Sequence, residues 1–177
     1  MTIINVPWIK LPKANYEQLK NGTKGIVFKL SSQYVAKVLY KFEGEDYFIR
    51  EDNSALAELE YEYNINKILF ENKIGNVPKP LEIKDFKLYN GKIYPAFIME
   101  YISDLPHGDK IINIHHKSIA KHLVETEVYK ALDIAIFPGR DFLHPWNYFY
   151  DRENERVRLI DFGRWVTGEL TKSPYDN

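Results

Sequence analysis

The sequence predicts an α+β fold, with an antiparallel sheet in its N-terminal half and a mainly helical C-terminal half. Two observations carry this prediction. Strand-like stretches lie on both sides of one helical segment in the N-terminal half, and a second long helical segment follows them. The chain has 177 residues, 45% of them hydrophobic, and its 13 Tyr and 10 Phe suffice for a sizeable core. This length favours one domain, divided at most into two small lobes.

The N-terminal half should hold short strands joined by turns, after an amphipathic lead-in over 1–20. The expected strands are 25–30, 34–40, 81–88 and 92–101. The last two flank an Asn-Gly pair, which is a strong hairpin signal. Residues 42–50 are either a loop or another strand. Apolar residues that recur at intervals of three and four predict a helix over 54–71, with Asn53 or Ser54 as its N-cap.

The C-terminal half begins with a polar, irregular stretch over 103–117, which is expected to connect the lobes. A second helix is expected over 118–137, ended by a Pro-Gly pair. Its apolar residues should share one face: Ile119, Leu123, Val124, Val128, Leu132 and Ile136. Two short strands, around 148–150 and 157–160, follow. The lobes of the single domain are therefore expected at about 15–102 and about 103–177.

Charge and composition exclude several classes of function. The chain carries 24 basic and 25 acidic residues, so no electrostatic argument favours nucleic acid or an anionic membrane. It has no cysteine, which excludes thiolate catalysis and Cys-based zinc sites. Residues 1–8 lack the basic start and long apolar run of a signal peptide, and no segment reaches the apolar length of a membrane span. We expect a cytoplasmic protein; an effector that acts in a host cell and keeps an uncleaved signal would look the same.

The most informative segment is Ile160-Asp161-Phe162-Gly163, which follows a short apolar strand. Asn147 precedes Asp161 by fourteen residues, and a hairpin between them would let both converge on one divalent metal. Mg²⁺ prefers oxygen ligands, and a carboxylate with an amide oxygen supplies them. The pair predicts a site for nucleotide phosphates.

A lysine and a glutamate extend this hypothesis. Lys37 lies among apolar strand residues, where an ammonium needs a partner because burying it unpaired is costly. Glu58 and Glu62 lie four apart on one helix face, and we expect Glu62 to be that partner. The alternatives are a lysine at a solvent-facing strand edge and glutamates on a solvated helix face.

Two further segments carry weaker signals. Gly22 and Gly25 frame a turn in which exposed backbone N–H groups can bind phosphate, although an ordinary flexible turn has the same pattern. The strand 97–101 would offer backbone groups to a purine edge, or it is simply a core strand.

Taken in order, these segments resemble the protein-kinase family over roughly residues 20–165. The Leu-His-Pro-x-Asn form of the loop before Asn147 is more similar to small atypical and antibiotic-kinase-like members than to large eukaryotic kinases. The resemblance implies ATP with Mg²⁺ or Mn²⁺ as cofactors. It assigns roles to individual residues: Gly22 and Gly25 over the phosphates, Val27 over the adenine, Lys37 on the α- and β-phosphates and paired with Glu62, Met99 as gatekeeper, Glu100 and Ile102 as backbone contacts to adenine, and Asn147 and Asp161 as metal ligands.

The chain departs from the family pattern at the catalytic base. The family places an Asp five residues before the metal-binding Asn, and here that position is Phe142. Asp141 lies one residue further back; either the loop bulges by one residue and Asp141 serves as the base, or the base is lost. His144 is a fallback base. His107-Gly108-Asp109 imitates the family's catalytic triplet but comes too early in the chain, so it is expected to be linker.

Two other departures concern the ends of the resemblance. Lys20 stands where the family has the first glycine of its phosphate loop. Only residues 164–177 follow Gly163, so the resemblance is to a minimal, truncated member of the family, of the small bacterial, phage or effector type. A short C-lobe should leave apolar surface exposed, and this predicts a partner protein. His115, His116 and His122 are expected to be solvated rather than metal ligands.

Three functions remain open. The first is ATP-dependent phosphoryl transfer to a Ser or Thr hydroxyl, on a partner protein or on the chain itself, with Asp141 and Lys37 as catalytic residues. The second is a pseudokinase that binds nucleotide and serves as an interaction module. The third is a small-molecule kinase of the antibiotic-phosphotransferase type.

Overall fold

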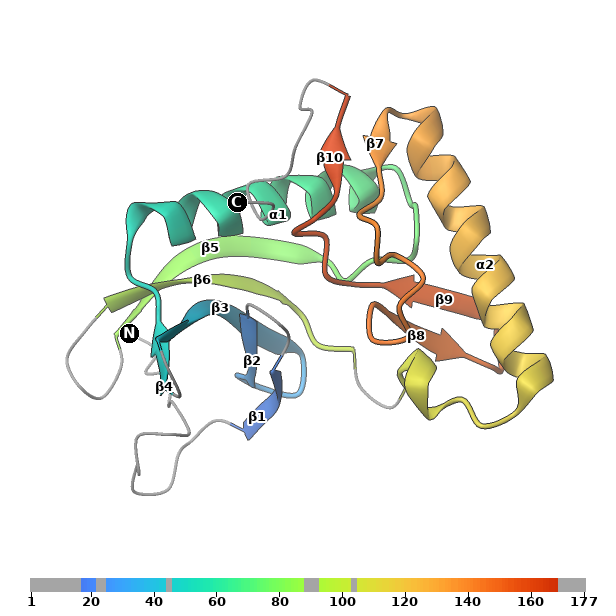
Figure 1. Ribbon diagram of the computed structural model, residues 1–177, viewed down its shortest axis with the longest axis horizontal. Coiled ribbons are helices and arrows are strands. Elements are labelled where there is room, and N and C mark those ends of the chain that lie inside the picture. Colours follow the sequence, from blue (N-terminus) through green and yellow to red (C-terminus); the bar gives the residue numbers. More distant parts are fainter. Residues whose placement is uncertain (1–16, 22–24, 44–45, 88–92, 103–104, 169–177) are drawn as a thin grey trace. The chain divides into compact units, whose positions relative to one another are not determined.

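The computed structural model of the chain describes residues 17–21, 25–43, 46–87, 93–102 and 105–168 (Figure 1). The chain divides into two compact units. The first comprises Met1–Tyr63 and Pro80–Tyr101, and the second comprises Asn64–Lys79 and Ile102–Asn177. The second unit thus includes the end of the first long helix and the loop that follows it, in addition to the C-terminal half.

An antiparallel sheet forms most of the first unit. Its strands are β1 (Glu17–Asn21), β2 (Gly25–Lys29), β3 (Tyr34–Glu43), β4 (Asp46–Ile49), β5 (Pro80–Lys87) and β6 (Ile93–Glu100). They lie in the order β1-β2-β3-β6-β5, and β4 pairs with the end of β3. The predicted N-terminal sheet is therefore confirmed. The segment 42–50 proves to be the end of β3 together with β4, and the lead-in contributes the edge strand β1.

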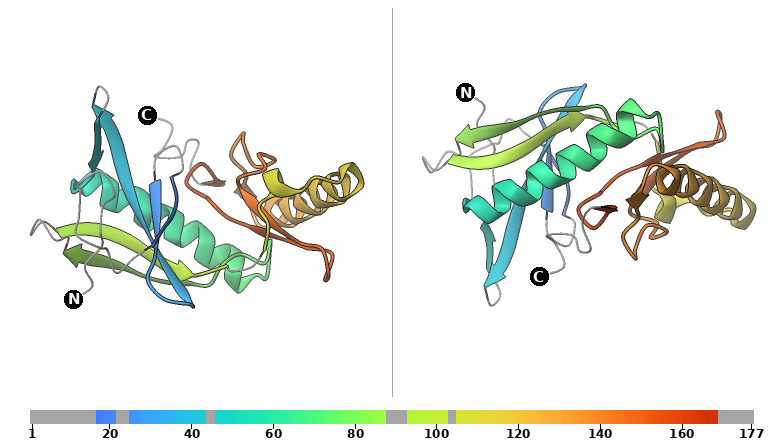
Figure 2. Two further views of the ribbon diagram at one scale, coloured as in Figure 1. Left: turned by 90° about the horizontal axis from the view of Figure 1, so that it is seen from below. Right: turned by 90° about the horizontal axis from the view of Figure 1, so that it is seen from above.

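The alternation of side chains along β3 gives its two faces different neighbours. Ala36, Val38 and Tyr40 point into a buried apolar cluster that they share with β2 and β6. Lys37 and Leu39 point to the opposite face, along which helix α1 (Asn53–Glu71) lies (Figure 2). On that face Tyr63 of α1 contacts Phe97 of β6 edge to face, with ring centroids 5.6 Å apart. Lys37 is therefore directed at a helix and not at solvent.

Helix α1 begins one residue earlier than its sequence predicts, and its cap is a different residue. Asp52 Oδ1 accepts a hydrogen bond from the backbone N–H of Ala55 at 2.8 Å, which is the geometry of an N-cap. The prediction of Asn53 or Ser54 as the cap was wrong by one or two positions. Both of those residues lie inside the first turn.

The second unit contains helix α2 (Ile114–Asp133) beside the β8–β9 hairpin (Figure 2). Its remaining elements are η1 (Gly108–Lys110), β7 (Ile136–Phe137), β8 (Tyr148–Asp151), β9 (Arg156–Leu159) and β10 (Val166–Thr167). Strand β8 pairs with β9, and β7 pairs with β10. The hairpin strands agree with the two predicted after the second helix.

The prediction of α2 was wrong at both ends. Asn113 caps the helix by accepting hydrogen bonds from the N–H groups of His115 and His116, so it starts four residues before the predicted 118–137. It ends at Asp133, because Ala135 adopts a positive φ of 56° and Ile136 turns into a strand. The buried residues of the helix are Ala120, Val124, Val128 and Ala131. Leu132, predicted on the apolar face, is 37% exposed.

Within the described part of the chain, no helix combines the length and apolarity that crossing a bilayer requires.

Candidate functional site

The first unit contains a buried ion pair. Lys37 Nζ lies 2.7 and 2.8 Å from the two carboxylate oxygens of Glu62. The side chains are 10% and 2% exposed. The contact predicted between them is confirmed, and the alternatives of a solvent-facing lysine and a solvated glutamate are excluded. Because a buried charge without a partner is strongly disfavoured, this pair fixes α1 against β3.

Two residues of β2 lie against Lys37. Val27 pairs with Lys37 across the β2–β3 ladder, and its side chain is half-buried. Gly25 is buried, and a Cβ built on it would lie 2.8 Å from Lys37 Cε. A side chain at Gly25 would therefore push the lysine aside, so this glycine keeps the space that the Lys37 side chain occupies. Gly22, the other predicted phosphate-loop glycine, falls outside the described residues.

The end of β6 carries the residues predicted to contact a purine. Met99 pairs with Val35 of β3, and Glu100 pairs with Tyr34. Both side chains are half-buried, and Ile102, just past the strand, is buried. Their contacts with a nucleotide remain predictions.

The loop that carries Asn147 is held by its own hydrogen bonds. Asn147 Nδ2 donates to the carbonyl oxygen of Asp141 at 2.8 Å, and His144 N donates to the same oxygen. The carbonyl of Asn147 accepts a hydrogen bond at 2.9 Å from the N–H of Ile160, the residue before Asp161. The structure thus brings the Asp141–Asn147 loop beside the end of β9, as the predicted hairpin requires. Since Nδ2 is engaged, Oδ1 is the Asn147 atom suited to ligate a cation.

Asp161 sits in a turn that displays its side chain. Its φ of 65° lies in the left-handed region, which few residues other than Gly, Asn and Asp adopt. The next residue, Phe162, is buried and packs edge to face on Trp165 with ring centroids 5.4 Å apart. Asp161 itself is exposed. Residues with a backbone in this sparsely populated region cluster at functional sites, and here the exposed Asp161 stands beside the buried Phe162.

The chemistry of these two side chains fits Mg²⁺ or Mn²⁺. An amide oxygen and a carboxylate are hard ligands, and Mg²⁺ is commonly held by one or two such groups together with substrate phosphates and water. Among the described residues, no group of three or more His, Cys, Asp or Glu side chains gathers as a metal site. That Asn147 and Asp161 would hold such an ion remains a prediction.

Asp141, the predicted base, lies beside an arginine that sequence reasoning did not connect with it. Arg164 Nη1 lies 3.4 Å from Asp141 Oδ2, and the two side chains are 45% and 41% exposed. An ion pair this exposed contributes about 0–1 kcal/mol, so a polar substrate group can displace it. The backbone carbonyl of Asp141, and not its carboxylate, is held by the hydrogen bond from Asn147 Nδ2. The use of Asp141 as a base remains a prediction.

His107 and Gly108 occupy a structural position. His107 forms a β-bridge with Phe149, and their rings are 4.0 Å apart. Gly108 is buried against the ring of Tyr148, where a Cβ would collide with it. These contacts agree with the prediction that the triplet beginning at His107 connects elements. The fallback base, His144, is exposed.

No protein-family model matches the chain, and no protein of curated function matches it in sequence. Solved structures do match its shape. The chain is similar to the Rio2 kinase of Chaetomium thermophilum in its ADP/Mg²⁺-phosphoaspartate complex, with a TM-score of 0.57 and 15% identity over 89% of this chain and 50% of that one. It is also similar to WbdD in a co-crystal with the kinase inhibitor LY294002, with a TM-score of 0.51 and 16% identity over 91% of this chain and 34% of that one.

These likenesses show that the chain has the protein-kinase-like α+β fold, which confirms the predicted fold class. The chain spans half the length of the Rio2 kinase structure and about a third of the WbdD structure.

Proposed function

We propose that the chain is an ATP-dependent phosphotransferase that uses Mg²⁺ or Mn²⁺ and transfers phosphate to a Ser or Thr hydroxyl, on a partner protein or on itself. The observation that carries the proposal is the buried Lys37–Glu62 pair. Phosphoryl transfer needs positioned charge more than covalent chemistry from the protein. A lysine fixed by a carboxylate on a kinase-like sheet supplies such a charge.

Each proposed residue has a definite task. Lys37 binds the α- and β-phosphates, Glu62 orients its ammonium, and the backbone after Met99 receives the adenine. Asp141 accepts the proton that leaves the acceptor hydroxyl as its oxygen bonds to phosphorus and the bond to the β-phosphate oxygen breaks. Asn147 and Asp161 would hold the metal. When bound, the ion neutralises phosphate charge.

The similar Rio2 kinase structure holds ADP/Mg²⁺, which supports the choice of nucleotide and metal. That support concerns the fold, since the identity is 15%. The acceptor rests on the resemblance alone, and the partner protein rests on the apolar surface expected of a short C-lobe.

Incubation with γ-labelled ATP and Mg²⁺ or Mn²⁺ tests the proposal. The wild type should transfer label to itself or to an added protein acceptor such as casein. Asp141→Ala should lose at least about a hundredfold of the rate, the usual contribution of a positioned acid–base group. Asp161→Ala should lose at least as much, because a bound metal ion stabilises the transition state by several kcal/mol. Asp133→Ala, which changes an exposed aspartate at the end of α2, is the matched control and should keep the wild-type rate. Transfer that persists undiminished in Asp161→Ala contradicts the assignment.

One observation favours a second candidate, a pseudokinase that binds nucleotide without turnover. Asp141 lies six residues before Asn147, whereas the family places its base five residues before the metal-binding Asn. This candidate predicts that ATP raises the melting temperature of the wild type while no label is transferred. Any transfer that Asp141→Ala abolishes decides against it.

A further inference from the structure

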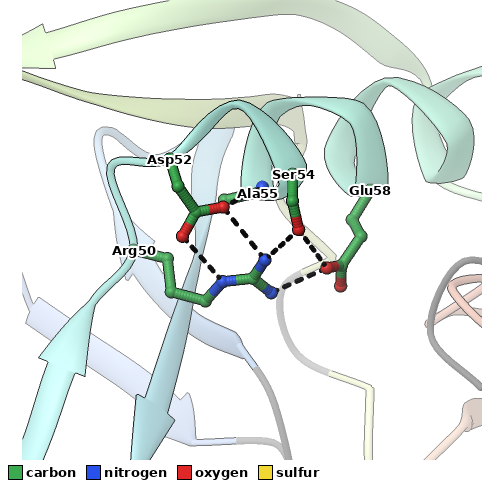
Figure 3. Close-up of polar contacts among 5 residues, drawn as sticks. All are labelled: Arg50, Asp52, Ser54, Ala55 and Glu58. Carbon is green, nitrogen blue, oxygen red and sulfur yellow. Dashed lines mark hydrogen bonds and ion pairs between the residues drawn. The ribbon is translucent and has the colours of Figure 1, made fainter. Parts of the chain in front are cut away.

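A second ionic network joins α1 to the sheet, centred on Arg50 (Figure 3). Arg50 directly follows β4, and its guanidinium lies 2.7 Å from Glu58 Oε1 through Nη1. Its Nη2 and Nε lie 3.1 and 3.3 Å from the two oxygens of Asp52, and Nη2 also donates to Ser54 Oγ. The one side chain thus holds the capping carboxylate and the buried face of the helix at the same time.

Two of the three charges of this network are well shielded from water, whereas the Asp52 side chain is 51% exposed. The Glu58 side chain is 9% exposed and that of Arg50 is 15% exposed. The hydrogen bonds from Arg50 are the largest influence on the Asp52 carboxyl and hold its pKa below the ordinary value. Asp52 Oδ1 in turn accepts the N–H of Ala55 and caps α1. Arg50 therefore fixes both where the helix starts and how it is rotated.

The network and the Lys37–Glu62 pair both link α1 to the sheet, the pair from β3 and the network from the residue after β4. The N–H of Arg50 donates to the carbonyl of Leu39 at 3.0 Å, and Leu39 lies two residues beyond Lys37 on β3. Glu58 lies four residues before Glu62 on α1. Two residues of strand cover about 7 Å, and four residues of helix cover about 6 Å. The two links are thus matched in spacing, and together they prevent the helix from pivoting about either one.

We infer that Arg50 is a positioning residue, which places α1 so that Glu62 meets Lys37. Its side chain makes hydrogen bonds to Asp52, Ser54 and Glu58, so its effect on Glu62 passes through the helix. With Arg50 removed, α1 loses this link to the sheet, and the Lys37 amine spends more time away from Glu62. The consequence for nucleotide binding rests on the proposed function, but the placement of Lys37 is measurable without any nucleotide.

Trace acetylation of the nucleotide-free protein by acetic anhydride, read by mass spectrometry, measures the accessibility of the Lys37 amine. In Arg50→Gln the acetylation rate of Lys37 should rise on the order of tenfold, within the range of coupling found inside one ion-pair network. Arg156→Gln is the matched control. It breaks a comparable pair, Arg156 to Asp151 at 2.9 Å, in the second unit, and it should leave the Lys37 rate unchanged.

A double variant separates positioning from general loosening. Glu62→Gln alone should raise the acetylation rate of Lys37. Adding Arg50→Gln should raise it no further, because Arg50 affects Lys37 only by placing the Glu62 carboxylate. A Lys37 rate that is unchanged in Arg50→Gln, that rises equally in Arg156→Gln, or that rises again in the double variant overturns the inference. If Arg50→Gln does not fold, Glu58→Gln takes its place with the same expected outcomes.

The same proteins distinguish failure of the inference from failure of the proposed function. Titration with ATP and Mg²⁺ should show weaker binding in Arg50→Gln than in Arg156→Gln. If the acetylation rates are as expected but the protein binds no ATP, Arg50 is a positioning residue and the proposed function is refuted. Normal ATP binding together with an unchanged Lys37 rate in Arg50→Gln refutes the inference alone.

Discussion

At the scale of single residues, the assignment depends most on Lys37. It lies on the face of β3 that meets α1, and its ammonium is paired with Glu62 in a site largely closed to water. Burying two charges is costly, and a hydrophobic pair of the same size is often as stable. This pair is the observation on which the proposed phosphate-binding role of Lys37 rests.

Lys37→Met should destabilise the protein by about 3–5 kcal/mol, because it leaves the Glu62 carboxylate buried without its cation. Lys37→Met combined with Glu62→Gln should recover part of that loss, since the uncompensated charge is removed. Urea unfolding followed by circular dichroism measures both variants. Strictly additive losses would show that the two side chains do not interact as the structure places them.

Sequence reasoning found some of these partners and missed others for physical reasons. Helix geometry puts Glu58 and Glu62 on the face of the apolar residues, and Glu62 could be chosen because it lies one turn nearer the centre of the helix. Arg50 precedes the helix on a connection whose path sets where its side chain goes, and no local pattern encodes that path. The contact between Arg164 and Asp141 depends on the paths of the loop at Asn147 and of β9, which separate the two residues in the chain. One signal in the sequence pointed to Arg50. Glu58 shares the face of Glu62 on the helix, so a buried Glu58 would need a cation of its own besides Lys37.

At the scale of elements, the strands and helices were predictable where the periodicity is long and uninterrupted. Helix α1 and strands β2, β5 and β6 lie within one or two residues of their predicted positions. Helix α2 was placed too late in the chain because its apolar pattern runs on into β7, whose pairing with β10 is a long-range contact. The positive φ of Ala135 ends the helix, although this position holds neither Gly nor Asn, the residues that usually adopt such a conformation after a helix.

The β8–β9 hairpin, which leads to Asp161, should lose stability in acid through Asp151. Hydrogen bonds from Asn154 above all, and from Arg156, hold the pKa of this buried carboxyl below its ordinary value of 3.8. A carboxyl with a lowered folded-state pKa adds stability that is fully present above its unfolded pKa. That stability is lost as the pH falls through the folded-state value.

Asp151→Asn should therefore be less stable than the wild type at pH 7, by about 1–3 kcal/mol for the lost charge-assisted hydrogen bonds. The difference should shrink as the pH falls below about 4. Urea unfolding at pH 7 and in steps towards pH 2 measures it. A gap between the two proteins that stays constant with pH would mean that Asp151 is not charged in the folded hairpin.

At the scale of the whole molecule, the order of elements predicted the α+β class and the kinase-like arrangement, and the similar solved structures have that fold. The assignment of Asn64–Lys79 to the second unit was not predictable, because helix α1 runs continuously through the division. The hydrogen bonds that tie this segment to the second unit, such as Leu159 N to Gly75 O at 2.8 Å, join residues far apart in sequence.

The two units carry different parts of the proposed machinery. Lys37 and Glu62 belong to the first unit, while Asn147 and Asp161 belong to the second. The proposed function gives residues of each unit a part in nucleotide binding. Loss of either part should therefore weaken nucleotide binding, whatever the acceptor proves to be.

Calorimetric titration of the full chain with ATP, in Mg²⁺ and again in EDTA, tests this claim most directly. The wild type and the control Asp133→Ala should bind ATP in a metal-dependent way. Lys37→Met should bind ATP at least about tenfold more weakly, because a lost charged contact commonly costs about 1.5–3 kcal/mol. Asp161→Asn should lose the dependence of ATP binding on the metal, because the proposed carboxylate ligand is removed. A wild type that binds no ATP, or an Asp161→Asn variant that binds as the wild type does in Mg²⁺ and in EDTA, would contradict the account.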